Sequence, residues 1–162
     1  MTHLFFDTSA IAKRYAVEPG TDTVDHLIES SDSTVLITSL TIVELASALR
    51  RKQNRDALSR SDVDRLLTVF FRESLEEFTI VALDETRFEQ ALDLVLEDDL
   101  RTLDSLQLAA ALEVNADLEC QFVCADDDLI SVADTHGLET IDPTADDPLA
   151  GISLGNGRDN DC

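Results

Sequence analysis

Short apolar runs alternate along this chain with longer segments in which apolar residues recur every three or four positions. The runs predict five strands, at residues 3–6, 34–38, 78–83, 121–124 and 138–141. The helical spacing predicts helices between them, from about residue 9 to a break near 19–20, around 24–28, over 40–53, from about 61, over 84–97, over 102–115 and over 128–135. Because strands alternate with helices, the sequence predicts an α/β fold in three layers, with a mostly parallel five-stranded sheet.

The apolar pattern also suggests where the folded domain ends. Within the domain, the helix over 84–97 has an apolar face that carries Phe88, Ala91, Leu92 and Val95. From Pro143 onward, Pro, Gly, Asn and Asp dominate without any periodicity. We therefore expect one domain over residues 1–142 and a loose acidic tail over 143–162. No apolar run approaches the roughly 18 residues of a membrane span, and we expect a cytoplasmic protein with no membrane partner.

Acidic residues dominate the charge of the chain. It has 162 residues, of which 34 are acidic and 12 are basic, with a formal net charge of −22. Aspartate is abundant and lysine scarce, a composition that resembles the carboxylate-coated surfaces of proteins from salt-loving cells. Three cysteines form no CxxC pair, so that neither a zinc ribbon nor a disulfide framework follows from them.

Four of the acids stand where chemistry gathers in a parallel sheet, beyond the carboxyl ends of strands. Asp7 and Asp126 directly follow predicted strands, Glu44 lies early in the next predicted helix, and Asp104 opens another. Clustered carboxylates repel one another unless a positive charge lies between them. Hard cations such as Mg²⁺ or Mn²⁺ prefer these oxygen ligands and activate water for attack on phosphate. The set therefore points to metal-assisted phosphodiester hydrolysis.

Other interpretations of these acids remain open. In a chain this acidic, a single Asp or Glu is more often a solvated surface group. Asp7 could simply be the N-cap of the helix that follows it, with no role in catalysis. A non-catalytic acidic binding module would leave Glu44 and Asp104 exposed and far apart. A phosphoacceptor domain like a response regulator would need an acidic pair after the first strand and a lysine after the fifth. This chain has a single Asp7 there and no lysine after Lys52.

Four segments in order resemble the PIN-domain family of ribonucleases, in particular the VapC-type toxins of toxin–antitoxin pairs. They are residues 6–10 (FDTSA), 39–45 (SLTIVEL), 103–110 (LDSLQLAA) and 122–129 (FVCADDDL). The resemblance covers residues 4 to about 141. It implies that Asp7, Glu44, Asp104 and Asp126 are the catalytic, metal-binding acids. Ser9 takes the family's hydroxyl position beside the first acid, and Asp128 is a second choice for the fourth acid.

The resemblance also implies what such a domain does. We expect a Mg²⁺- or Mn²⁺-dependent endoribonuclease, usually a homodimer, that cuts structured RNA of the tRNA or rRNA class. A cognate antitoxin would hold it inactive through a segment that enters the acidic site. The alternatives are a housekeeping PIN nuclease in RNA or DNA processing without an antitoxin, or the non-catalytic binding module.

Binding of RNA by so acidic a chain depends on where its few bases lie. Eight of the 12 lie between residues 13 and 65. Arg51 and Arg55 follow Glu44 at i+7 and i+11, on roughly the same face of the predicted helix. We therefore expect Lys13, Arg14, Arg51 and Arg55 to be candidates for contacts with RNA phosphates.

Overall fold

The structure, a computed structural model, describes residues 1–30 and 32–150. Its helices and strands alternate as the apolar pattern predicts. In chain order they are β1 (Thr2–Phe6), α1 (Thr8–Tyr15), α2 (Thr21–Glu29), β2 (Ser33–Thr38), α3 (Ser39–Asn54), α4 (Arg60–Glu76), β3 (Thr79–Val81), α5 (Glu85–Asp98), α6 (Thr102–Leu118), β4 (Cys120–Val123), α7 (Asp127–Thr135) and β5 (Thr140–Ile141).

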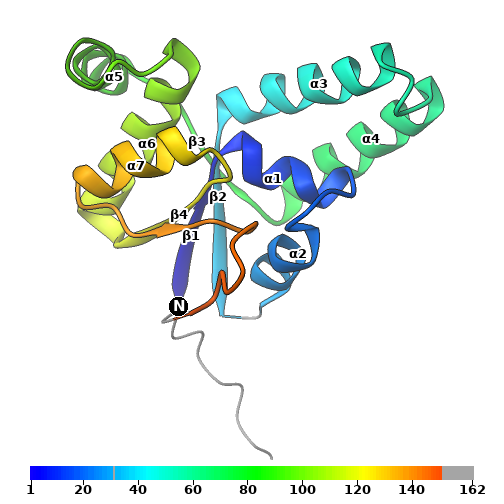
Figure 1. Cartoon of the computed structure of the whole chain (residues 1–162), viewed down its shortest axis with the longest axis horizontal. Coiled ribbons are helices and arrows are strands. Elements are labelled where there is room, and N and C mark those ends of the chain that lie inside the picture. Colours follow the sequence, from blue (N-terminus) through cyan, green and yellow to red (C-terminus); the bar gives the residue numbers. More distant parts are fainter. Residues whose placement is uncertain (31, 151–162) are drawn as a thin grey trace, which may run out of the picture.

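The five strands form one sheet in the order β3-β2-β1-β4-β5, and every neighbouring pair is parallel (Figure 1). The predicted α/β class is confirmed. Strand β1 lies in the centre, with Phe5 level with Leu36 of β2 and with Phe122 of β4. The chain builds outward in one direction through β2 and β3, and in the other through β4 and β5. The strand order therefore reverses between β1 and β4, which is the place where open α/β sheets bind ligands.

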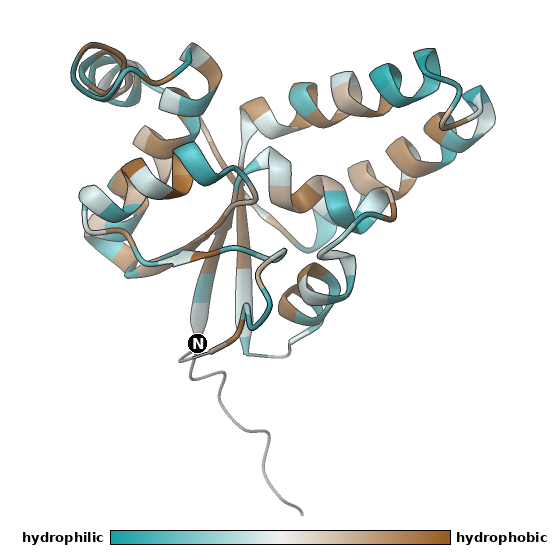
Figure 2. Cartoon of the chain, viewed as in Figure 1, coloured by the Kyte–Doolittle hydropathy of each residue, from teal (hydrophilic) through white to brown (hydrophobic). Residues whose placement is uncertain are grey.

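Helices cover both faces of the sheet, because successive strand side chains point to opposite sides. Phe5 and Leu36 face a core that contains residues of α5, α6 and α7. Leu4, Phe6 and Ile37 face the opposite core, which contains residues of α1 to α4. Figure 2 shows the brown, hydrophobic strands between the two sets of helices. The result is the three-layer architecture that the alternation predicts.

The helix α5 differs from the sequence-based expectation. Phe88 and Leu92, on its apolar face, are 53% and 56% exposed, and Leu96 one turn later is 74% exposed. Ala91, from the same predicted face, is buried in the core, as is Leu94. The stripe of Phe88, Leu92 and Leu96 therefore points to solvent, because α5 packs on the core through the side that carries Ala91 and Leu94.

The start of the predicted tail follows the surface of the domain. Pro143 is buried, and Leu149 packs against the core that contains α1 to α4. Gly20 has a positive φ of 94°, and a Cβ there would lie 2.8 Å from the Pro143 carbonyl oxygen, so that only glycine suits this contact. Residues 151–162 of the predicted tail lie outside the described residues. Among the described helices, none is long and apolar enough to cross a membrane.

Candidate active site

Asp7 directly follows the carboxyl end of β1, and Asp126 lies in the β4–α7 loop, after a strand that pairs with β1 in the sheet. The backbone N–H of Asp7 donates to the Val123 carbonyl at 2.9 Å, which extends the β1–β4 ladder by one step. The Asp7 side chain caps α1, since its Oδ2 accepts from the Ser9 N–H at 2.9 Å. Asp126 caps α7 in the same way, with Oδ1 accepting from the Leu129 N–H at 3.0 Å. Each carboxylate thus has a rigid position at a helix N-terminus, where negative charge is favoured.

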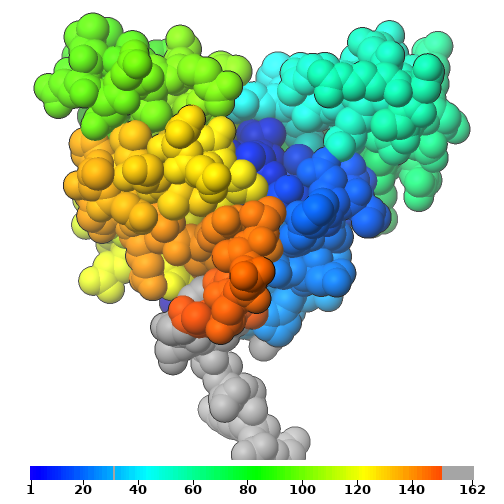
Figure 3. Space-filling model, viewed as in Figure 1, coloured from blue at the N-terminus to red at the C-terminus, as the bar shows by residue number. Residues whose placement is uncertain are grey.

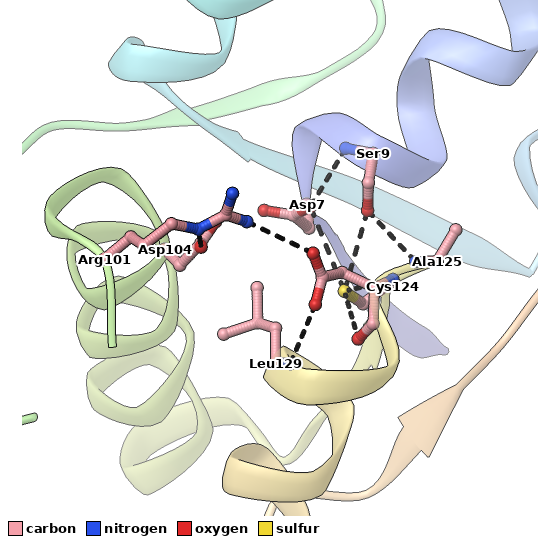
Figure 4. A network of polar contacts seen from close by, with 8 residues as sticks. Asp7, Ser9, Arg101, Asp104, Cys124, Ala125 and Leu129 are labelled. Atoms are coloured by element: carbon pink, nitrogen blue, oxygen red, sulfur yellow. Dashed lines mark hydrogen bonds and ion pairs between the residues drawn. The ribbon is translucent and has the colours of Figure 1, made fainter. Parts of the chain in front are cut away.

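Ser9 and Cys124 connect the two loops that carry these acids (Figure 4). Ser9 Oγ accepts from the Ala125 N–H at 3.0 Å, across 116 residues of sequence. The Cys124 thiol is buried and lies 3.6 Å from Ser9 Oγ and 3.9 Å from Asp7 Oδ2. Burial, together with the nearby Asp7 charge, raises the pKa of this thiol. In the structure Ser9 therefore fixes the distance between the two loops.

Glu44 is held by a buried amide from the other side of the sheet. Gln107 on α6 is 1% exposed, and its Nε2 donates to Glu44 Oε1 at 2.9 Å. The same nitrogen lies 3.0 Å from the hydroxyl oxygens of Thr8 and Thr41. The Gln107 carbonyl oxygen accepts from the Thr38 hydroxyl at 3.0 Å. One side chain thus connects α1, β2, α3 and α6 and orients Glu44.

Asp104 lies in the first turn of α6 next to an arginine. Arg101 Nε donates to Asp104 Oδ2 at 2.8 Å, and Arg101 Nη2 lies 3.3 Å from Asp126 Oδ2. Both Arg101 and Asp104 point from α6 towards Asp7 (Figure 4). The guanidinium therefore bridges the two acids that come from α6 and from the β4–α7 loop.

The structure brings the four acids to one end of the sheet. Glu44 and Asp104 line the same hollow, which Figure 3 shows between α5 and the α3–α4 pair. Burial raises the pKa of Asp7, and repulsion from Asp104 adds to it. Burial also raises the pKa of Glu44, with further repulsion from Asp7. A surface coat would leave Glu44 and Asp104 exposed and far apart, whereas here both are partly buried and line one hollow.

The donor chemistry of this cluster fits a hard divalent cation. Burial and mutual repulsion both weigh against ionised carboxylates here, and a divalent ion would relieve both. Hydrogen bonds from the described residues reach only one oxygen of Asp7, Glu44 and Asp104. Within residues 1–30 and 32–150, however, no three ligating side chains are close enough to hold an ion together. Side chains would therefore have to turn inward around an ion.

Two of the four candidate RNA-binding cations are engaged by acids of the chain itself. Lys13 is buried and its Nζ lies 3.3 Å from Glu18, which also pairs with Lys52. Arg14 makes a bidentate contact with Glu73 at 2.9 and 3.0 Å, with a further contact to an acid of α2. These pairs join α1 to its neighbouring helices.

The other two cations lie on exposed positions of α3. Arg51 lines the hollow that also contains Glu44 and Asp104, and its Nη1 donates to Ser47 at 2.8 Å. Arg55 is exposed at the C-terminus of α3, where a cation suits the helix dipole. A basic approach to the acids thus runs along α3.

Two residues of the site were missed from the sequence. Gln107 is the single polar residue in the buried run 105–111 apart from Ser105, and a polar group in such a run needs a partner. Arg101 precedes Asp104 by three residues, a spacing that permits an ion pair on a helix. The sequence thus contains a local signal for each of the two residues, but it does not reveal the distant residues that they contact.

Fold and site together define a class of protein: a parallel α/β domain with four carboxylates at the switch point of its sheet. The PIN domain family model matches residues 4–135. The chain therefore belongs to the PIN domain family, whose members are nucleases. None of the curated proteins matches the chain in sequence.

Several solved structures share the fold at low sequence identity. Mycobacterium tuberculosis VapC20, a sarcin–ricin loop cleaving toxin, is 16% identical with a TM-score of 0.61, covering 80% of this chain and 94% of its own. VapBC2 from Rickettsia felis, bound to a promoter DNA fragment, is 15% identical with a TM-score of 0.63, covering 86% and 97%. PAE2754 from Pyrobaculum aerophilum is 20% identical with a TM-score of 0.59, covering 86% and 83%. These likenesses concern the fold.

Proposed function

We propose that this chain is a Mg²⁺- or Mn²⁺-dependent endoribonuclease that acts as the toxin of a toxin–antitoxin pair in the cytoplasm. The observation that carries the proposal is the convergence of Asp7, Glu44 and Asp104 from three distant segments, with raised pKa values for the first two. Perturbed carboxylates that meet in a hollow are typical of functional sites. The structural similarity to VapC20 and VapBC2 supports the proposal that this PIN nuclease is a toxin.

Each acid has a distinct position for this chemistry. Asp7 is the most buried of the four and is fixed by its cap, so that it would form the floor of the metal site. Glu44 and Asp104 approach from opposite sides of the hollow, and Asp126 closes the β4 side. A divalent ion held by these acids would lower the pKa of a bound water and neutralise charge on the scissile phosphate.

Cleavage of total RNA is the direct test. We expect discrete cleavage by the wild type with Mn²⁺, no cleavage with EDTA, and none by the Asp7→Asn variant. Asp22→Asn, an exposed change on α2, is the matched control and should cut like the wild type. Normal cleavage by Asp7→Asn would contradict the proposal, as would cleavage in EDTA.

A second pair of variants tests the choice of the fourth acid. Asp126 caps α7 and contacts Arg101, whereas Asp128 is exposed within the helix. Asp126→Asn should therefore reduce cleavage far more than Asp128→Asn. Asn still caps a helix well, so that the comparison does not depend on loss of the fold. The reverse order would assign the fourth acid to Asp128.

The route for RNA lies along α3, past Arg51 and Arg55. Both lie on exposed positions, whereas Lys13 and Arg14 are held in ion pairs that an RNA phosphate would have to break. At about 1 M salt the Debye length is only about 3 Å, so that the net charge of −22 repels RNA over short distances only. Structured RNA of the tRNA or rRNA class is the substrate we propose, and cleavage should be measured at low and high salt.

The partners we propose are an antitoxin and a second copy of the chain. VapBC2 is a neighbour with its antitoxin present, and a basic antitoxin segment would suit the four carboxylates. The exposed stripe Phe88, Leu92 and Leu96 on α5 would be covered in a homodimer. Leu92→Glu should then give a monomer in light scattering. A monomeric wild type would contradict the proposed homodimer. The alternative function, a housekeeping nuclease, differs in having no antitoxin partner.

A further inference from the structure

Arg101 is the only cation among the described residues that contacts any of the four acids. Asp7, Glu44 and Oδ1 of Asp126 accept hydrogen bonds from neutral donors. Neutral donors do not compensate the negative charge of these carboxylates. The guanidinium, by contrast, holds Asp104 Oδ2 at 2.8 Å and Asp126 Oδ2 at 3.3 Å. Asp126 thus has one oxygen on its helix cap and the other on Arg101, so that an ion bound by Asp126 would share this carboxylate with the guanidinium.

The position of Arg101 also divides the space around the acids. Together with Asp104 it lines the hollow towards α3, which contains Glu44 and Arg51. The same two residues line a second hollow towards α7, which contains Asp126. The guanidinium therefore lies between Glu44 of α3 and Asp126 of the β4–α7 loop, where an ion that joins them would have to lie.

Little holds Arg101 in this position. Its side chain is 79% exposed, and exposed ion pairs contribute little to stability because water competes for both partners. Arg101 is the N-cap residue of α6, but its side chain makes no capping hydrogen bond. The guanidinium can therefore leave without unravelling the helix that positions Asp104.

We propose that Arg101 is a built-in competitor of the divalent ion, so that guanidinium and ion occupy the acid cluster in turn. This proposal rests on the proposed function, since it concerns the same site. Without an ion, Arg101 reduces the repulsion between Asp104 and Asp126. An ion of charge +2 bound to Asp104 and Asp126 competes with the guanidinium for the same two carboxylates and repels it, so that binding of the ion displaces Arg101 towards solvent. Arg101 thereby lowers the affinity for the metal and partly neutralises the negative charge of the site when no ion is bound.

Mn²⁺ binding to the RNA-free protein tests this without any measurement of activity. The free-ion electron paramagnetic resonance signal gives the affinity for the wild type and for the Arg101→Gln variant at the same ionic strength. We expect Arg101→Gln to bind Mn²⁺ on the order of 3- to 10-fold more tightly, as loss of two exposed ion pairs predicts. Arg101→Lys, which keeps the charge but not the planar fork, should lie between the two.

Arg51→Gln is the matched control, because it removes the same charge from the same hollow. Arg51 contacts Ser47 rather than a carboxylate, so that its loss should change Mn²⁺ affinity less than about 2-fold. Equal gains in both variants would show an effect of net charge and overturn the competition. Equal or weaker binding by Arg101→Gln would overturn it as well. If neither the wild type nor Arg101→Gln binds Mn²⁺, the proposed metal site itself fails.

Thermal unfolding gives an independent readout. Without metal, Arg101→Gln should unfold at a lower temperature than the wild type, because two acids lose their counter-charge. With saturating Mn²⁺ the two proteins should unfold at nearly the same temperature or the variant higher, since tighter binding to the folded state stabilises it more. A purely structural Arg101 would lower the unfolding temperature equally with and without Mn²⁺, and that result would contradict the proposal.

Discussion

The buried amide of Gln107 allows a quantitative test of how the site is held together. We consider the change Gln107→Met, which keeps the length and approximate volume of the side chain but removes its hydrogen bonds. Gln107 is 1% exposed, so that water cannot replace these bonds. The change therefore separates the polar network from the packing of α6 against the sheet.

The structure sets the size of the expected effect. The Nε2 of Gln107 has two hydrogens to share among Glu44 Oε1 at 2.9 Å and the Thr8 and Thr41 hydroxyls at 3.0 Å. The Oε1 of Gln107 accepts one more bond, from the Thr38 hydroxyl. A bond to a half-exposed carboxylate contributes about 1.5 kcal/mol, and two neutral bonds about 0.5–1.5 kcal/mol each. Burial of a thioether in place of an amide offsets about 1 kcal/mol. The net loss is about 1.5–3.5 kcal/mol, or about 3–14 °C in Tm for a domain of this size.

Urea unfolding and thermal unfolding measure this loss. Gln53→Met is the matched control, because Gln53 accepts a single bond from Arg50 at the surface of α3. Its free energy of unfolding should stay within about 0.5 kcal/mol of the wild type. Gln107→Met should also weaken Mn²⁺ binding, since Glu44 is then free to turn away. An unchanged urea midpoint for Gln107→Met would refute the view that this network holds Glu44 in place.

Three further predictions follow from the charged groups. Asp7→Asn should raise the free energy of unfolding near neutral pH, because burial raises the folded-state pKa of Asp7 above its unfolded value and ionisation then destabilises the fold. This gain in stability should shrink as the pH falls through the folded-state pKa, and urea titrations that show the same gain at every pH would contradict the reasoning. Glu73→Gln should cost about 1–3 kcal/mol in urea unfolding, because it leaves the largely buried Arg14 with weaker partners, and a loss below 0.5 kcal/mol would show that the pair is not needed. Arg51→Ala and Arg55→Ala should each weaken RNA binding in a filter assay without loss of Mn²⁺ binding, and unchanged RNA affinity in both would exclude the route along α3.

The parts of the site that were predictable from sequence depend on local rules. Asp7 and Asp126 each follow an apolar strand and precede a helix, so that their place at the carboxyl edge follows from the order of elements. The parallel sheet then brings β1 beside β4 and the two acids to one edge. The helix starts and strand ends are properties of a few neighbouring residues, which a single sequence displays.

The parts that were not predictable depend on contacts between distant segments. Gln107 meets Glu44 across 63 residues, and Arg101 meets Asp126 across 25, and no local spacing contains either pairing. Phe88 shows a related limit of the apolar pattern. Its spacing places it on an apolar helix face, but that face can pack against the core of the same chain or remain exposed, as it does here. Periodicity identifies an apolar face without specifying its partner.

The way in which the acids are held gives the charge of the site a physical meaning. Asp7 and Glu44 are held by hydrogen bonds from neutral groups, so that the fold fixes their positions while burial keeps their pKa values raised. At neutral pH, folding therefore carries an electrostatic cost at this edge of the sheet, which a bound cation would relieve. Anything that binds the folded state alone stabilises it, so a divalent ion should stabilise this protein through the very groups that destabilise it when bare. The same reasoning explains why an exposed Arg101 suits this position better than a buried cation: a fixed counter-charge would relieve the cost permanently and lower the affinity for the ion.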